Sequence, residues 1–425
     1  MQQNVRGLRV GIAGLGTVGG GLIEIVRGPK NYSVFDDARG HIAIVAVSAR
    51  DRARKRAVNL DGLEWFDDAR ALAVSPNIDV FVELIGGADG IALEAVQAAL
   101  DHGKSVVTAN KALLAKHGPA LSARAEKNNA ILRFEAAVAG AVPIIASLRQ
   151  SLSVMCVTRL TGILNGTCNY ILSEMESAGL DYRTALKNAQ EQGFAEADPA
   201  LDVEGVDAAQ KLAILSAIVF GKFPDERDIA VTGIDGLHAV DLEAARSIGR
   251  RVRLVATASR DGDRVGLEVA PVFALPESNI GAVMGPDNFI SISGEPVGDV
   301  WLGGPGAGAG ATAGAVAGDI LAIARGEMGP VFGREPGNIL RGGTDNVLGM
   351  RSRFVIRAKA SHDAMISMIE GHKITGRAIA LSGPNSEFAV IESDPIDGAA
   401  ITALKQGLDS SVMKDSFAVF RLIDK

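Results

Sequence analysis

The sequence predicts an α/β protein that combines a Rossmann-type N-terminal domain, an α+β middle part and a C-terminal ferredoxin-like module. In residues 1–134, short apolar segments alternate with segments of helical spacing, the order expected for a parallel sheet covered by helices. Residues 203–220 form a proline-free stretch whose second half is apolar nearly all round, which is typical of a helix buried in a core. Residues 350–425 follow the order strand, helix, strand, strand, helix, strand.

Length and composition indicate a globular protein of two or three domains. The 425 residues carry a net charge of -7, and this acidic balance argues against nucleic acid as the main partner. Neither Cys156 nor Cys168 has a zinc-type neighbour, and the six histidines lack metal-ligand spacing, so we expect a reducing compartment and no zinc site. Residues 301–318 are uncharged but too rich in glycine and alanine to span a bilayer, and no signal peptide is evident, so cytoplasmic location is expected.

The first strand, at residues 8–13, is followed at once by Gly14-Leu15-Gly16-Thr17-Val18-Gly19 and then by apolar residues at helical spacing. In this order of strand, turn and helix, Gly14 permits the tight turn and Gly16 lets the backbone approach a pyrophosphate. Gly19 lets the helix pack closely on the strand. The motif therefore predicts a dinucleotide site at the N-terminus of the first helix.

The second strand, at residues 41–48, follows a loop with Pro29, Asp36 and Gly40, and Arg50 lies two residues beyond its end. An arginine at this strand tip suits the 2′-phosphate of NADP, so Arg50 favours NADP over NAD. The alternative is that the arginines here are solvated and that Asp51 holds the ribose hydroxyl of NAD.

Two further strands, at residues 79–85 and 105–108, end in Gly86-Gly87 and in Asn110-Lys111, with a helix at 92–102 between them. Because ligands lie at the carboxyl ends of such strands, Lys111 is a candidate for the cofactor cleft. The alternative is a surface lysine that opens the next helix.

Later elements are less distinctive. The run at residues 303–314 opens a helix expected at 313–325, and is either an anion-binding loop or a flexible linker. Strands are expected at 132–135 and 157–163, a helix after residue 164 that ends near Gly179, and a hairpin formed by 252–258 and 265–272. The last module is expected to have strands at 354–360, 374–381, 388–393 and 416–423, helices at 363–370 and 399–408, and a linker at 341–349.

The central helix is expected to run from residue 203 to 220, with Asp202 as N-cap and Gly221 as its end. Glu204, Asp207 and Lys211 then share one stripe that continues into apolar residues. A lysine that enters the interior is desolvated, which lowers its pKa towards the range needed for proton transfer, although Asp207 opposes this shift. The alternative is an ordinary surface Asp–Lys pair.

Five motifs resemble those of homoserine dehydrogenases: the Gly14 to Gly19 turn, Thr108-Ala109-Asn110-Lys111, Glu135-Ala136-Ala137-Val138-Ala139-Gly140, Leu164-Asn165-Gly166-Thr167-Cys168-Asn169-Tyr170, and residues 193–211. The similarity extends nearly from end to end. It implies a reversible NAD(P)-dependent interconversion of L-homoserine and L-aspartate 4-semialdehyde, on the route to threonine and methionine, by a homodimer or homotetramer. It also implies a nucleotide domain at 1–134 completed by about 306–345, a substrate and dimerisation domain at 135–305, and an ACT-like regulatory domain at 350–425.

The resemblance also implies roles for particular residues. Lys211 is the catalytic proton donor or acceptor, supported by Asp207 and Lys111, and Lys111 also lines the cofactor cleft. Glu196, Asp207 and Gly193 border the substrate. The nucleotide lies near Thr17, Val18, Gly193, Glu196 and the glycine loop of Gly306 and Gly308. A monovalent cation such as Na⁺ is held mainly by the main-chain carbonyls of Glu135, Val138, Gly140 and Val142.

Two departures from the family pattern are present. Gly310-Ala311-Thr312 lacks the proline that usually precedes the threonine, and Ala360-Ser361-His362-Asp363 replaces the Pro-Gly-Val turn of ACT domains, so regulation by threonine stays an open question. Two other functions are also open. An acylating semialdehyde dehydrogenase would use Cys168 as a thiolate nucleophile. A nucleotide-sensing regulatory protein would catalyse no reaction.

Overall fold

The computed structural model describes residues 7–28, 42–342, 344–345, 351–381, 387–406 and 416–424. Internal contacts divide the chain into two compact units. Unit 1 comprises Met1–Met155, Ala213–Phe223 and Gly304–Arg341, and unit 2 comprises Cys156–Leu212, Pro224–Gly303 and Gly342–Lys425. The polar loop expected before the second strand, and most of the linker expected at 341–349, lie outside the described residues.

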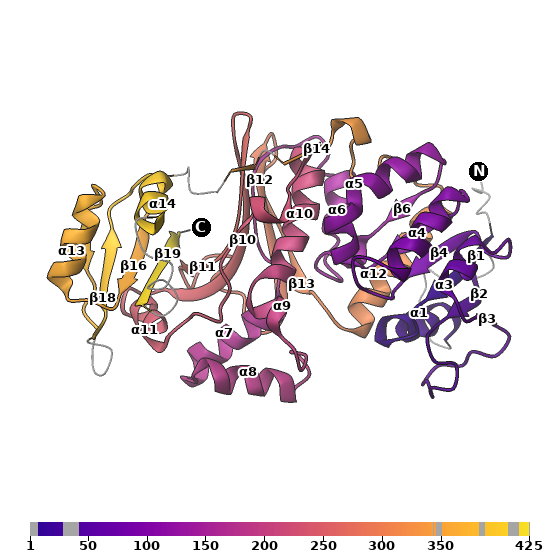
Figure 1. Cartoon of the computed structure of the whole chain (residues 1–425), viewed down its shortest axis with the longest axis horizontal. Helices are drawn as coiled ribbons and strands as arrows, with labels where there is room; N and C mark the ends of the chain where they lie inside the picture. Colours follow the sequence, from indigo (N-terminus) through magenta and orange to yellow (C-terminus); the bar gives the residue numbers. More distant parts are fainter. Residues whose placement is uncertain are drawn as a thin grey trace. The chain divides into compact units, whose positions relative to one another are not determined.

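Unit 1 is built on a six-stranded parallel sheet (Figure 1). Its order, β3-β2-β1-β4-β5-β6, reverses direction between β1 and β4, which confirms the doubly wound arrangement predicted from the sequence. Ligands of such sheets bind at the carboxyl ends of the strands beside this reversal. The strands are β1 (Leu8–Ala13), β2 (Ile42–Ser48), β3 (Glu64–Phe66), β4 (Val80–Glu83), β5 (Ser105–Thr108) and β6 (Leu132–Arg133).

Helices of unit 1 pack apolar side chains against this sheet. In α4, Ala92, Ala95, Val96 and Ala99 recur at helical spacing and are fully buried. The same principle places Leu22 and Ile23 of α1 in the core formed with β1, β2 and β4. The helices are α1 (Thr17–Arg27), α3 (Ala69–Val74), α4 (Ile91–Asp101), α5 (Lys111–Lys127), α6 (Ile144–Arg149) and α12 (Ala309–Ala324).

Helix α12 begins four residues earlier than expected, at Ala309. Gly308, with a φ of +107°, is its N-cap, so the second half of the glycine-rich run is helical and not a linker. The reason is close packing on α1: a Cβ at Gly21 would lie 3.2 Å from the Cβ of Ala313 and 3.3 Å from the carbonyl oxygen of Ala309. Small residues therefore allow the close contact between the two helices, and the loop between β13 and α12 is limited to residues 306–308.

Unit 2 contains a mixed sheet in the order β13-β12-β7-β10-β11-β19-β16-β18-β17, with short strands β9 and β15 also paired to β11. The predicted hairpin is confirmed, because β10 and β11 pair in continuous register from Arg251 opposite Ala274 to Asp261 opposite Arg264. The strands are β7 (Cys156–Ile163), β9 (Ala230–Val231), β10 (Arg251–Asp261), β11 (Arg264–Ala274), β12 (Asp287–Glu295), β13 (Gly298–Pro305) and β15 (Thr344–Asp345).

The single central helix predicted from residue 203 to 220 is wrong. The segment forms α9 (Ala200–Val203) and α10 (Val206–Phe220), separated by Gly205, whose φ is +85°. A Cβ at Gly205 would lie 3.0 Å from the Cγ1 of Val231, so a long-range contact helps to fix the break. Asp202 lies inside α9 and is not an N-cap, and Glu204 is an exposed residue outside α10. The body of α10 is buried, as predicted.

The C-terminal module shows the predicted order of elements: β16 (Phe354–Ala358), α13 (His362–Gly371), β17 (Gly376–Ala378), β18 (Ala389–Ser393), α14 (Gly398–Gln406) and β19 (Phe417–Ile423). Its strands are antiparallel to one another in the order β19-β16-β18-β17, and both helices contribute to a core with the sheet. Strand β19 also pairs with β11, so the module continues the sheet of unit 2.

Short elements complete the structure: α7 (Gly166–Ala178), α8 (Tyr182–Glu191), α11 (Ala239–Ser247), β8 (Lys222–Phe223), β14 (Leu340–Arg341) and the 3₁₀ turns Glu135–Ala137, Glu226–Asp228 and Pro336–Asn338. Helix α7 ends at Gly179 in the left-handed conformation, as its sequence predicts. None of the helices in the described ranges has both the length and the apolar character needed to cross a bilayer.

Candidate active site

The glycine-rich turn after β1 uses its three glycines in different ways. Gly14 has a φ of +106°, and a Cβ there would collide with the carbonyl group of Leu84. A Cβ at Gly19 would collide with the carbonyl group of Gly14, so the absence of a side chain lets α1 approach the turn. Gly16, the N-cap of α1, has open space around it, as a close ligand approach requires. Thr17 is exposed and Val18 half-buried in the first turn of α1.

Arg50 is exposed directly after β2 and makes no hydrogen bond or ion pair within the described chain. The neighbouring Asp51 is engaged locally, because its Oδ1 accepts hydrogen bonds from the backbone N–H groups of Ala53, at 2.8 Å, and Arg54, at 3.2 Å. Arg56 lies 5.4 Å from the ring centre of Trp65. The Asp51 carboxylate is thus engaged within its own loop, whereas the exposed Arg50 guanidinium has no partner in the described chain, which favours a ligand phosphate over a ribose hydroxyl.

Glu83, at the end of β4, was not identified from the sequence. Its buried carboxylate accepts hydrogen bonds from the backbone N–H of Ile85, at 2.8 Å, and the hydroxyl of Thr108, at 2.5 Å. It therefore ties the ends of β4 and β5 together. The sequence feature that could have identified Glu83 is its position as a polar residue at the end of an otherwise apolar strand.

Asn110 and the Gly86-Gly87 turn lie side by side, as strand order predicts. The Nδ2 of Asn110 donates to the carbonyl of Gly87 at 2.7 Å, and its Oδ1 caps α5 by accepting from the N–H of Leu113. Lys111 follows as the first residue of α5 and is half-buried.

The segment from Glu135 to Val142 is buried apart from Ala141 and strongly curved. Ala139 and Gly140 have φ values of +58° and +51°, and the N–H of Ala141 donates to the carbonyl of Pro305 at 3.1 Å. The buried carbonyls of Val138 and Gly140 accept no hydrogen bond from any described residue. Oxygens of this kind fit a hard monovalent cation. The described residues contain no cluster of three or more histidine, cysteine or acidic side chains that could hold a metal.

In unit 2, Lys211 and Asp207 form a buried ion pair. The Nζ of Lys211 donates to Asp207 Oδ2 at 2.7 Å and to the carbonyl oxygen of Leu164 at 2.8 Å. Their side chains are 13% and 5% exposed, which rules out the ordinary surface pair. An ammonium held in this way is positioned to exchange a proton with a nearby oxygen.

Asn165, which lies in one of the five motifs but was assigned no role from the sequence, is a second functional candidate. Its Nδ2 donates to Asp202 Oδ1 at 2.7 Å and to Asp207 Oδ2 at 2.9 Å. Its Oδ1 accepts from the N–H of Cys168 at 2.8 Å and caps α7. The amide thus orders the carboxylate that pairs with Lys211. An asparagine just before a helix predicts a cap, but its spatial partners are 37 and 42 residues away in the chain.

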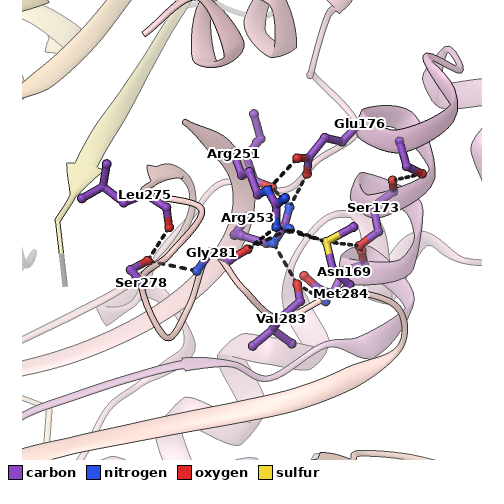
Figure 2. Close-up of polar contacts among 12 residues, drawn as sticks. Asn169, Ser173, Glu176, Arg251, Arg253, Leu275, Ser278, Gly281, Val283 and Met284 are labelled. Carbon is purple, nitrogen blue, oxygen red and sulfur yellow. Dashed lines mark hydrogen bonds and ion pairs between the residues drawn. The ribbon is translucent and has the colours of Figure 1, made fainter. Parts of the chain in front are cut away.

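A network of polar groups links α7 to β10 and to the loop after β11 (Figure 2). Asn165 is the N-cap of this helix. The fully buried Arg253 of β10 contacts Glu176 of α7 at 3.1 Å and donates to the carbonyls of Val283, at 3.1 Å, and Gly281, at 3.1 Å. Asn169 of α7 donates to the carbonyl of Gly285 at 2.8 Å. These contacts hold the loop after β11 against α7.

Two expected site residues are on the loop between α8 and α9. Gly193 is exposed with a φ of +78°, and Glu196 is exposed. The carbonyl oxygen of Glu196 accepts from Gln190 at 3.1 Å, whereas its carboxylate makes no hydrogen bond or ion pair within the described chain. This carboxylate is therefore available to a ligand.

Cys168 is fully buried, and its thiol donates to the carbonyl of Asp202 at 3.1 Å. Burial raises the pKa of this thiol, and the charges of Asp202 and Asp207 raise it further. A protonated, inaccessible thiol cannot act as the nucleophile of an acylating dehydrogenase.

Comparisons with known proteins agree on one family. The family models "Homoserine dehydrogenase" and "Homoserine dehydrogenase, NAD binding domain" match residues 143–321 and 14–135. The homoserine dehydrogenase of Synechocystis is 40% identical over 320 residues, which cover 74% of this chain and 73% of that protein. A homoserine dehydrogenase structure from Thiobacillus denitrificans has a TM-score of 0.86 and 32% identity and covers 99% of both chains. A hyperthermophilic archaeal homoserine dehydrogenase in complex with NADPH has a TM-score of 0.64 and 26% identity, with 76% of this chain and 99% of that chain covered.

Proposed function

The chain belongs to the homoserine dehydrogenase family, and we propose that Lys211 is the proton carrier of its reaction and NADP its preferred cofactor. The protein is an NAD(P)-dependent oxidoreductase that acts on a CH–OH group, converting L-aspartate 4-semialdehyde reversibly to L-homoserine. The buried Lys211–Asp207 pair is the observation that carries the proposed mechanism.

In the direction of reduction, a bound reduced nicotinamide would supply a hydride to the aldehyde carbon. The carbonyl π electrons move to oxygen, and Lys211 donates a proton from its ammonium to that oxygen, which gives the alcohol. In the reverse direction, the neutral amine of Lys211 would accept the hydroxyl proton while the hydride would leave carbon for the oxidised nicotinamide. Asp207 and the Leu164 carbonyl orient Nζ through the two hydrogen bonds described above.

The substrate is proposed to bind through its ammonium to Asp207 and Glu196, beside Gly193. The exposed carboxylate of Glu196, which has no partner among the residues that the structure describes, supports this assignment. Asp207 would then serve both the substrate and Lys211, with Lys111 as a second catalytic lysine.

The cofactor is proposed to lie on Gly14, Gly16, Thr17, Val18 and Gly19, with its 2′-phosphate on Arg50. The open space at Gly16 and the engagement of Asp51 in its own loop support NADP. The NADPH complex of the archaeal neighbour agrees with this preference. The remaining proposed contacts are Lys111, Gly193, Glu196, Gly306 and Gly308.

A monovalent cation such as Na⁺ is proposed at the main-chain carbonyls of Glu135, Val138, Gly140 and Val142. The carbonyls of Val138 and Gly140, which accept no hydrogen bond from the described part of the chain, support it.

We also propose that residues 350–425 form a ferredoxin-like, ACT-like regulatory module, and that the chain acts as a homodimer or homotetramer. The strand order β19-β16-β18-β17 supports the first part. The proposed domain limits are 1–134 completed by about 306–345, 135–305, and 350–425.

A spectrophotometric assay tests the function. Purified protein is expected to oxidise NADPH when L-aspartate 4-semialdehyde is added and to reduce NADP⁺ with L-homoserine, with a higher kcat/KM for NADP(H) than for NAD(H). Dependence on phosphate or coenzyme A would instead indicate acylating chemistry. Absence of turnover with both substrates would indicate a regulatory nucleotide-binding protein.

A further inference from the structure

Glu83 is a carboxylate buried at the C-terminal end of β4, and no part of it is exposed. It forms no ion pair with any residue that the structure describes. Acidic side chains are almost never fully buried in folded proteins unless they are paired with a cation, because the charge loses its hydration. The charge at this position therefore calls for a functional explanation.

The hydrogen bonds to Glu83 are those of an ionised carboxylate held in one orientation. Its Oε1 accepts from the backbone N–H groups of Ile85, at 2.8 Å, and Gly86, at 3.1 Å. Its Oε2 accepts from the hydroxyl of Thr108 at 2.5 Å, and the oxygen of this hydroxyl accepts from the N–H of Asn110 at 3.0 Å. Both carboxylate oxygens thus accept, and Glu83 donates to none of the described residues.

The order of the sheet assigns Glu83 to the nicotinamide half of the proposed cofactor site. In a sheet of order β3-β2-β1-β4-β5-β6, each half of the sheet takes one mononucleotide of a dinucleotide. The proposed contact of Arg50 with the 2′-phosphate assigns the adenosine half to β1, β2 and β3, and the turn after β1 takes the pyrophosphate. The nicotinamide half then belongs to β4, β5 and β6, and Glu83 is the last residue of β4.

The backbone directly after Glu83 is accessible to a ligand. Gly86 and Gly87 are exposed, with φ values of +85° and +82°, and a Cβ at either position would meet nothing within 4 Å. The turn is nevertheless fixed, because Asn110 Nδ2 donates to the carbonyl of Gly87 at 2.7 Å. A ligand can therefore approach this turn while the Glu83 carboxylate stays shielded from water.

The charge of the nicotinamide ring differs between the two redox states of the cofactor. The ring is positively charged when it is oxidised and neutral when it is reduced. A fixed carboxylate stabilises a positive ring and has little effect on a neutral one, and exclusion of water strengthens the attraction. Glu83 can therefore distinguish NADP⁺ from NADPH by charge alone.

We propose that Glu83 sets the preference of this chain between the two redox states of its cofactor, by stabilising the oxidised nicotinamide. This inference rests on the proposed function, because it requires a nicotinamide cofactor on the sheet of unit 1. The same charge would favour the departure of the hydride from NADPH, since positive charge develops on the ring as the hydride leaves. Glu83 acts here as a fixed charge and exchanges no proton.

Isothermal titration calorimetry of the full chain with NADP⁺ and with NADPH tests the proposal. The measured quantity is the Kd for NADP⁺ divided by the Kd for NADPH. Glu83→Gln has nearly the same shape and lacks the charge, so it is expected to raise this ratio about threefold or more.

Two control variants separate charge from structure. Thr108→Val removes a hydrogen bond to Glu83 and keeps its charge. Glu94→Gln removes an exposed carboxylate of α4 that pairs with Arg70. Each is expected to change the ratio by less than about twofold, because neither alters the buried charge. A rise in Thr108→Val as large as that in Glu83→Gln would show that loosened structure sets the ratio, and would overturn the proposal.

A Glu83→Gln variant that folds only with cofactor bound still gives the ratio. Unfolding of the free chain weakens the apparent affinity for NADP⁺ and for NADPH by the same factor, which cancels in the ratio. The concentrations of each cofactor that restore the circular dichroism spectrum then replace the calorimetric constants.

The outcomes distinguish this inference from the proposed function. Binding of both cofactors with a rise in the ratio of less than about threefold in Glu83→Gln overturns the proposal alone. Failure of the unchanged protein to bind either cofactor overturns both. Because the measurement does not depend on turnover, a raised ratio in a protein without dehydrogenase activity would support the role of Glu83 and contradict the proposed function.

Discussion

Asn165 donates from one amide nitrogen to two carboxylates, Asp202 and Asp207, and accepts the capping hydrogen bond of α7 with its oxygen. Each polar atom of this buried side chain therefore has a partner. Asp207 receives hydrogen bonds from Asn165 and from Lys211, so its orientation is determined from both sides. On this basis Asn165 is a positioning residue for the proton-transfer pair.

The substitution Asn165→Asp separates positioning from capping. It retains the oxygen that accepts from the N–H of Cys168 but replaces the donating nitrogen, so the carboxylates of Asp202 and Asp207 lose a donor and gain a repelling charge. We expect kcat to fall by roughly 10²-fold with little change in NADPH affinity, measured by steady-state kinetics and fluorescence titration.

Asp181→Asn is the matched control, because Asp181 caps the exposed helix α8 through the N–H of Thr184. It should leave kcat unchanged. Normal turnover in Asn165→Asp would show that the amide does not position Asp207.

The two cysteines are expected to differ in reactivity. Cys156 is exposed, whereas burial raises the pKa of the Cys168 thiol, so at pH 8 the Cys168 thiolate is scarce as well as inaccessible. In the native protein, iodoacetamide should modify Cys156 alone, and Cys168 should react only after denaturation, as followed by mass spectrometry. Rapid alkylation of Cys168 in the native protein would contradict this expectation and would support Cys168 as the thiolate nucleophile of an acylating dehydrogenase.

At the scale of elements, the regular strands and the glycine turn could be predicted because their signals are local. The segments at β1, β4 and β5 are short apolar runs, and Gly14 to Gly19 lies between a strand and a helix, so each assignment needs only neighbouring residues. The order of elements in the last module follows in the same way.

The break at Gly205 and the start of α12 could not be predicted, because both depend on distant contacts. Residues 203–220 contain no proline, and a single glycine does not by itself end a helix; the close approach of Val231 favours the break. From the sequence alone, Gly310 and Gly314 favour a loop. In the structure both lie in α12, which packs on Gly21 of α1. The partners of Asn165 and Glu83 were missed for the same reason.

The α1–α12 contact predicts opposite effects for two adjacent substitutions. A Cβ at Gly20 would lie 3.7 Å from Val58 Cγ1, an ordinary contact, whereas a Cβ at Gly21 would press on Ala313 and on the backbone of Ala309. Gly20→Ala should therefore raise the free energy of unfolding by about 0.5–1 kcal/mol through helix propensity. Gly21→Ala should lower it by about 1–2 kcal/mol through overpacking.

Urea denaturation of both variants measures the difference, and Gly20→Ala serves as the control for the loss of a helical glycine. Equal stability of the two variants would mean that α1 and α12 are not in close contact.

At the scale of the whole molecule, the C-terminal module is bonded into unit 2. Strand β19 continues the sheet beyond β11, and Arg357 of β16 donates from Nε to Asp241 of α11 at 2.7 Å. Both side chains are 1% exposed, and the second carboxylate oxygen of Asp241 accepts from the N–H of His238. We therefore expect the module and the rest of unit 2 to unfold together.

Breaking this buried pair tests that expectation. Arg357→Met leaves the Asp241 carboxylate buried with one partner fewer and should cost about 3–5 kcal/mol of unfolding free energy, whereas Arg357→Met with Asp241→Asn should recover part of the loss. Burial already raises the pKa of Asp241, and loss of the guanidinium raises it further. In Arg357→Met, Asp241 then keeps its proton to a higher pH in the native state than in the unfolded state. The variant should therefore lose additional stability as the pH rises from about 4 to about 7.

Chemical denaturation at several pH values measures these differences. Arg70→Met, which removes an exposed ion pair with Asp68 and Glu94, is the control and should change stability by less than about 1 kcal/mol. An equally small effect of Arg357→Met would show that the module is not coupled to α11.

The most direct measurement is the turnover of Lys211→Met with L-aspartate 4-semialdehyde and NADPH. Lys187→Met provides the matched control, because Lys187 forms an exposed i,i+4 pair with Glu191 on α8. If Lys211 carries the proton, Lys211→Met loses roughly 10³-fold or more in kcat while NADPH affinity and the circular dichroism spectrum stay unchanged, and Lys187→Met behaves as the unchanged protein. Near-normal kcat in Lys211→Met would contradict the mechanism.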